Sequence, residues 1–90
     1  MLKLDGISSF VAIAESGSIS EAARRLNLSK SVVSERLAEL ERMLGASLLH
    51  RTTRKVSLTE DGTAFLEKAA RIMRAVVEAV AGFAGFAPDH

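Results

Sequence analysis

The sequence of 90 residues contains no cysteine and only two histidines, His50 and His90. The absence of cysteine excludes disulfide bonds, thiolate metal ligands and a cysteine nucleophile. The two histidines are far apart in the chain, which argues against a histidine-based metal site. The sequence also lacks a zinc-ligand spacing, a phosphate-binding glycine loop and a Ser-His-Asp set. We therefore expect no metal, no cofactor and no catalytic residue.

Signals for export or membrane insertion are also missing. Residues 1–5 do not show the basic-then-apolar order of a signal peptide. The longest stretch rich in alanine and valine, residues 75–87, contains Glu78 and is too short to span a bilayer. We expect a cytoplasmic protein that does not contact a membrane. A hydrophobic content of 48% in 90 residues predicts one folded domain with a modest core.

The net charge of +1 conceals an uneven distribution of charge along the chain. Residues 24–55 carry eight basic and three acidic side chains, a net charge of +5. The segments on either side, residues 1–23 and 56–90, each carry a net charge of −2. A basic cluster of this kind is typical of proteins that bind the phosphate backbone of nucleic acids. On charge alone, a solvated surface with unevenly placed charges is the alternative interpretation.

The spacing of apolar residues predicts a mainly α-helical fold with one small β-hairpin. The expected elements are a helix over 4–16, a helix over 19–26, a helix over 31–44, a hairpin of 48–51 and 56–58, and a helix over 60–82. Ser18 and Glu21 form a capping box for the second helix, in which the Glu21 carboxylate reaches back to Ser18. Either Ser29 or Ser31 caps the third helix, and Thr59 caps the last one.

Two short helices joined by a tight turn and followed by a basic hairpin make a winged helix-turn-helix. We expect residues 1–59 to form this domain, and residues 60–90 to form a long linker or dimerisation helix with a frayed end from residue 83. The second and third helices are expected to pack through small and apolar side chains, namely Ala22, Ala23, Leu26, Leu28, Val33 and Leu37. This packing directs the opposite face of the third helix outward, where it fits the major groove of double-stranded DNA.

The candidate DNA contacts follow from this geometry. The first residues of the third helix face base edges, while helix N-termini, serine hydroxyls and the basic hairpin contact phosphates or the minor groove. The resulting set is Ser18, Ser20, Ser29, Lys30, Ser31, Ser34, Glu35, Arg42, Arg51, Thr53, Arg54 and Lys55. For the serines at 29–34, helix capping without DNA contact is the alternative.

Glu35 is the unusual member of this set because a carboxylate repels phosphate. It can instead accept a hydrogen bond from the amino group of cytosine. The alternative is an ion pair within the protein, for which Lys30 and Arg42 are the nearest basic candidates. Glu39, one turn further along the helix, is acidic and cannot pair with Glu35.

From Phe10 through Gly62 the sequence resembles the DNA-binding domain of LysR-type transcriptional regulators. The matching segments are residues 10–18, 22–29, 33–34, 40–41, 44–45, 48–49, Arg51 and 58–62. The resemblance implies a helix-turn-helix, a wing, and a linker helix that pairs with its mate in a dimer of a bacterial regulator. Related domains also occur in molybdate-responsive regulators, so the resemblance does not fix an effector. This chain departs from the usual pattern at Lys30-Ser31 and at Glu35.

The last helix carries more apolar residues than a small three-helix core can cover, and an exposed apolar helix face usually marks a partner. A second copy of the chain with an antiparallel helix is the simplest partner. The expected dimer contacts are Phe65, Ala69, Ile72, Met73, Val76, Val77, Val80 and Phe83. A winged-helix module that binds protein rather than DNA is the alternative function.

Members of the resembled family carry a much larger C-terminal ligand-binding domain, which 90 residues cannot contain. The sequence is then either a fragment of a longer regulator or a naturally short one. Residues 82–90 fall where the linker to that domain begins, which favours a fragment. We expect no site for a small-molecule effector within these residues.

Overall fold

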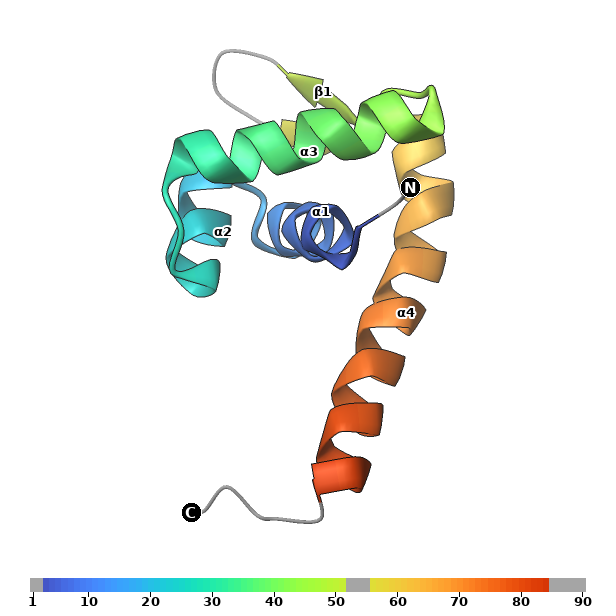
Figure 1. Ribbon diagram of the computed structural model, residues 1–90. Helices are drawn as coiled ribbons and strands as arrows, with labels where there is room; N and C mark the ends of the chain where they lie inside the picture. The colour runs from blue at the N-terminus through green and yellow to red at the C-terminus, as the bar shows by residue number, and fades with distance from the viewer. Residues whose placement is uncertain (1–2, 52–55, 85–90) are drawn as a thin grey trace.

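The computed structural model describes residues 3–51 and 56–84, which form a small helical body with one helix extending beyond it (Figure 1). The elements are α1 (Leu4–Ser16), α2 (Ile19–Leu26), α3 (Lys30–Leu44), β1 (Leu49–Arg51), β2 (Val56–Leu58) and α4 (Glu60–Ala84). The predicted winged helix-turn-helix fold and the order of its elements are confirmed. Three boundaries differ from the prediction: α3 begins one residue earlier, β1 begins one residue later, and α4 continues two residues further than expected.

Short polar residues set the ends of the helices. The Ser18 hydroxyl accepts a hydrogen bond from the Glu21 amide at 2.8 Å, as the capping box predicts. The Glu21 carboxylate does not reach back but binds Arg24 instead. Ser29, not Ser31, caps α3, because its hydroxyl accepts from the Val32 amide at 3.2 Å.

The tight turn between α2 and α3 depends on Asn27. This residue adopts a φ of 58°, the left-handed conformation that asparagine tolerates better than most side chains. Its amide donates to the carbonyl groups of Ala23 and Arg24, which closes the end of α2. The turn therefore brings α3 across α2 within a few residues.

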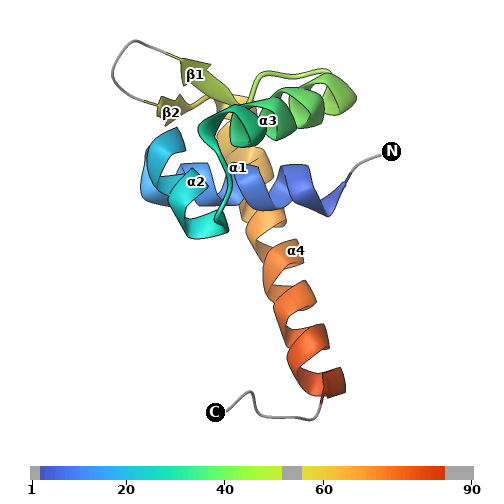
Figure 2. The same ribbon diagram turned by 60° about the vertical axis from the view of Figure 1, so that its left-hand side comes forward.

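Helix α1 lies at the centre of the body, and α2, α3 and α4 all pack against it (Figure 1). Phe10 and Ile13 of α1 are fully buried, as are Val33 and Leu37 of α3. Phe10 also meets Phe65 of α4, with ring centroids 5.7 Å apart. Helix α3 lies on one side of α1, and the C-terminal half of α4 extends on the other side (Figures 1 and 2). The outer side of α3 and the C-terminal half of α4 are therefore separate parts of the molecular surface.

The start of α4 packs tightly against the backbone that precedes the hairpin. The Thr59 hydroxyl donates to the Ser47 carbonyl at 2.6 Å and accepts from the Gly62 amide at 2.8 Å. A Cβ atom added at Gly62 would lie 2.0 Å from the carbonyl oxygen of Leu48. Only glycine fits this contact, so the hairpin and α4 are joined at a fixed angle. The two strands pair antiparallel, with Leu49 opposite Leu58.

This contact gives a test of the fold. We expect Gly62→Ala to lower the free energy of unfolding by about 3 kcal/mol, because the new methyl group meets backbone that cannot move freely. Gly82→Ala is the matched control, since nothing lies within 4 Å of an added Cβ there, and alanine in a helix should stabilise by about 0.5–1 kcal/mol. Thermal or urea unfolding measures both. Equal effects of the two substitutions would contradict the close approach at Gly62.

Candidate nucleic-acid interface

The outward face of α3 is formed by residues spaced three and four apart. Val33, Leu37 and Leu40 are buried against the body, so the opposite side of the helix faces outward. That outer row consists of Ser31, Glu35, Ala38 and Arg42, all exposed, with half-buried Ser34 on its flank. The row is free of large apolar side chains and is exposed, and the helix that carries it lies at one edge of the molecule (Figure 2).

The other predicted contacts surround the start of this row. Ser29 and Lys30 are exposed at the N-terminus of α3, where the first backbone amides of a helix have no partner within the helix. Ser18 and Ser20 lie at the start of α2, with Ser18 half-buried as the cap and Ser20 exposed. Two helix N-termini and their hydroxyl groups thus accompany the exposed face of α3, which is an arrangement suited to phosphate groups.

Arginine side chains around this face are held by acidic neighbours. Arg24 lies 2.5 Å from Glu21, and Arg42 lies 2.7 Å from Glu39. The hydrogen bond from Arg24 to Glu21, together with the negative charge of Glu21, raises the pKa of the Arg24 guanidinium. Such exposed pairs add little stability.

Glu41 connects α3 to the wing, a role that our sequence analysis missed. Its carboxylate accepts hydrogen bonds from the amides of Leu48 at 2.8 Å and Leu49 at 3.4 Å. Leu48 is only 1% exposed, so its amide needs a partner within the protein. The sequence contained one signal for this role. Glu41 is an acidic residue in the last turn of a helix, where its charge interacts unfavourably with the helix dipole, so a stabilising contact elsewhere in the protein could have been expected.

Much of the predicted wing contact falls outside the described residues. Thr53, Arg54 and Lys55 belong to this group, so their positions on the wing stay a prediction from the sequence. The backbone of Arg51 forms the last residue of β1. His50, the residue before it, is exposed.

The link between α3 and the wing can be tested through Glu41. We expect Glu41→Ala to lower the free energy of unfolding by about 2 kcal/mol, since it leaves the buried Leu48 amide without its acceptor. The matched control is Glu39→Ala, which removes one exposed ion pair and should change stability by less than about 1 kcal/mol. Chemical unfolding of the two variants gives the comparison. Similar losses would mean that the Glu41 carboxylate does not hold the wing.

The predicted partner face of α4 divides into two parts in the structure. Ala69 is fully buried within its own chain, and Phe65 and Met73 pack against the core, so these three already have contacts. Ala69 has no surface left for a partner, which corrects the expectation for that residue. Further along α4, Val77 and Val80 are 63% and 62% exposed.

Besides Met73, five larger apolar side chains in the C-terminal half of α4 are exposed or half-buried. They are Ile72, Val76, Val77, Val80 and Phe83, of which Val76 is half-buried and Phe83 is 95% exposed. We call these five residues the α4 stripe. The C-terminal part of the stripe is not covered by the residues that the structure describes, because α4 continues past α1, as both views of the ribbon show (Figures 1 and 2).

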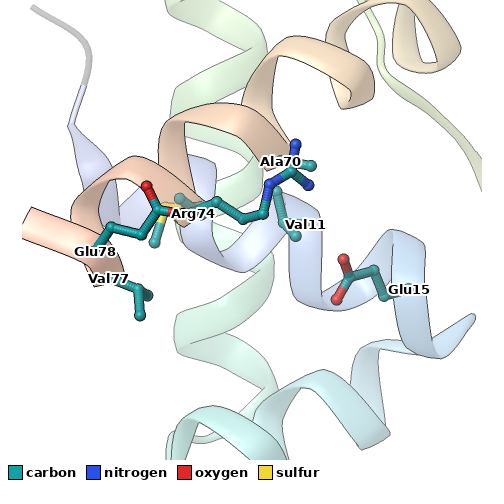
Figure 3. Close-up of a pocket in the computed structure, with 7 residues that line it drawn as sticks. Val11, Glu15, Ala70, Arg74, Val77 and Glu78 are labelled. Carbon is teal, nitrogen blue, oxygen red and sulfur yellow. The ribbon is translucent and has the colours of Figure 1, made fainter. Parts of the chain in front are cut away.

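An open groove between α1 and α4 adjoins the α4 stripe (Figure 3). Its apolar lining comes from Val11, Ala70, Met73 and Val77, and its charged lining from Glu15, Arg74 and Glu78. Figure 3 shows the side chains of Arg74 and Glu78 extending from α4 and that of Glu15 extending from α1. Val77 belongs to both the groove and the stripe, so the two form one continuous surface.

A family model described as bacterial regulatory helix-turn-helix protein, lysR family, matches residues 4–63, which include the whole helix-turn-helix and the wing. The chain belongs to the LysR family. An HTH-type transcriptional repressor of Pseudomonas aeruginosa is 41% identical over 85 residues, which cover 94% of this chain and 27% of that protein. The regulator CrgA of Neisseria meningitidis is 46% identical over 70 residues, covering 78% of this chain and 23% of CrgA.

Solved structures of this family show the same fold. The crystal structure of BenM DBD with catB site 1 DNA superimposes with a TM-score of 0.85 at 31% identity. That match covers 98% of this chain and 99% of the BenM chain. By contrast, the chain spans about a quarter of the length of these two LysR relatives.

Residues 3–51 and 56–84 contain neither a membrane-spanning helix nor a cluster of metal-ligating side chains. No helix there is long and apolar enough to cross a membrane. The same residues contain no group of three or more histidine, aspartate or glutamate side chains that could hold a metal ion.

Proposed function

We propose that this chain binds double-stranded DNA sequence-specifically, as the DNA-binding domain of a LysR-type transcriptional regulator. In this proposal α3 enters the major groove, and the wing contacts phosphates or the minor groove. The observation that carries it is the outer face of α3, which is exposed, polar and flanked by two helix N-termini. The domain would then act in the bacterial cytoplasm, where chromosomal DNA lies.

The charge distribution supports this orientation. The basic residues of the segment 24–55 that the structure describes lie on α2, α3 and β1, while the acidic excess lies in the flanking segments. The crystal structure of the related BenM DBD is a complex with DNA, and its chain matches this one over almost its full length. Both observations favour DNA over protein as the partner of α3.

Lys30 provides a direct test of the DNA contact. It is exposed at the start of α3 and makes no ion pair with any residue that the structure describes. We expect Lys30→Ala to weaken binding to all duplex sequences and to lower the salt slope of log Kd by about one, because one phosphate contact is lost. Removing both Arg54 and Lys55 should lower the slope by about two.

Mobility-shift titrations on a mixed-sequence duplex at two salt concentrations measure these slopes. Lys68→Ala is the matched control, because Lys68 is exposed on α4 and lies near Leu44, at the opposite end of α3 from Lys30. An unchanged slope in the Lys30 variant would remove this residue from the interface. If the unmodified chain shows no salt-sensitive binding at all, the alternative of a protein-binding winged helix is favoured instead.

We also propose that the chain forms a homodimer through α4. The α4 stripe is apolar and continuous with the groove beside α1, and most of it is exposed among the residues that the structure describes. In a two-fold symmetric pair, the same surface of each copy contacts the other copy, so one apolar helix face per chain is enough to form the interface. Such a dimer would present two α3 helices to two half-sites of DNA.

The stripe can be tested by placing charges in it. We expect Val77→Glu together with Val80→Glu to give a monomer by sedimentation, because pairing would bury two carboxylates without partners. Arg71→Glu with Ala75→Glu is the control, since both residues are exposed on another side of the same helix and should leave the dimer intact. A dimer of unchanged affinity in the Val77 and Val80 variant would place the pairing elsewhere.

A further inference from the structure

Glu35 is an exposed carboxylate in the middle of the predicted DNA-contacting face. It lies in the outer row of α3, one turn after Ser31 and one turn before Ala38. Both neighbours are small, so no longer side chain stands between the Glu35 carboxylate and a base edge in the groove. The position therefore suits a direct contact with a base.

The structure removes the ion-pair interpretation of this residue. The side chains one turn away on either side are Ser31, Val32, Ala38 and Glu39, none of which is basic. Arg42, the basic candidate further along the row, is already engaged by Glu39 at 2.7 Å. Among the residues that the structure describes, no basic side chain lies within ion-pair distance of the Glu35 carboxylate.

We propose that the Glu35 carboxylate selects a cytosine in each half-site by accepting a hydrogen bond from its N4 amino group. This inference rests on the proposed function, since it requires α3 to lie in the major groove. An ionised carboxylate only accepts hydrogen bonds, and cytosine is the base that presents an amino donor without an adjacent acceptor in that groove. Guanine and thymine present acceptors there and are repelled.

The negative charge of Glu35 also lowers the affinity for DNA in general, and this predicts the effect of substituting the residue. A carboxylate near the phosphate backbone weakens binding to every sequence, because it adds repulsion without regard to the base. Replacing Glu35 should therefore raise affinity for non-cognate DNA while lowering discrimination at one base pair. Substitution of a residue with a merely structural role would not raise the affinity for non-cognate DNA while lowering the discrimination at one base pair.

The first experiment is site selection from random duplexes with the unmodified chain, Glu35→Ala, Glu35→Gln and the control Glu67→Gln. Glu67 is exposed on α4, so its substitution removes one negative charge away from α3. We expect the unmodified chain and the control to enrich a cytosine at one position by about fivefold or more. Glu35→Ala should lose this preference, and Glu35→Gln should keep part of it because its amide oxygen still accepts.

The second experiment changes the base instead of the protein. N4-methylation replaces the groove-facing hydrogen of the cytosine amino group, while the remaining hydrogen still pairs with guanine. On the selected site, we expect N4-methylcytosine to weaken binding of the unmodified chain about fivefold and to leave Glu35→Ala unaffected. Thermal unfolding of each variant confirms that exposed residue 35 does not affect the fold.

The outcomes separate the two proposals. If the unmodified chain enriches no sequence, specific DNA binding itself is overturned, and this inference with it. If it enriches a site and Glu35→Ala enriches the same site with the same cytosine preference, DNA binding stands and the assignment of Glu35 is overturned. Equal sensitivity of both proteins to N4-methylation would overturn it as well.

Discussion

At Gly62 the backbone of α4 approaches the carbonyl oxygen of Leu48 so closely that no side chain fits between them. The Thr59 hydroxyl bridges the same place, bonding to both Ser47 and Gly62. This contact joins the loop after α3, the end of the wing and the start of α4. The direction in which α4 leaves the body, and hence the position of the α4 stripe, depends on it.

The α3 face and the wing are held together by the same region of the molecule. Glu41 near the end of α3 accepts from the amides of Leu48 and Leu49, and Leu48 in turn meets Gly62. The outer face of α3, the wing strands and α4 are therefore connected through a few backbone contacts around Leu48. A duplex that engages α3 meets the base of the wing in a fixed relation to it.

Local sequence signals predicted most of the fold because they act over a few residues. Ser18, Ser29 and Asn27 are caps and turns whose chemistry is visible in the sequence, and the helices they bound were found within two residues. Ala69 and Glu41 show what the sequence could not supply. Whether an apolar residue of α4 packs against α1 or against a partner depends on contacts between segments that are distant in the chain. The same is true of the groups that the Glu41 carboxylate binds near the end of α3.

The length of α4 has a consequence for the DNA that two paired chains could occupy. Its 25 residues span about 37 Å, and its first turns are locked to the body while the stripe lies in its C-terminal half. In a pair joined through the stripe, the number of residues between Gly62 and Val77 fixes how far apart the two α3 helices lie. One inserted residue would shift the stripe by about 1.5 Å and turn it by about 100°. The length of α4 would thus determine which spacing of DNA half-sites the paired chains can bind.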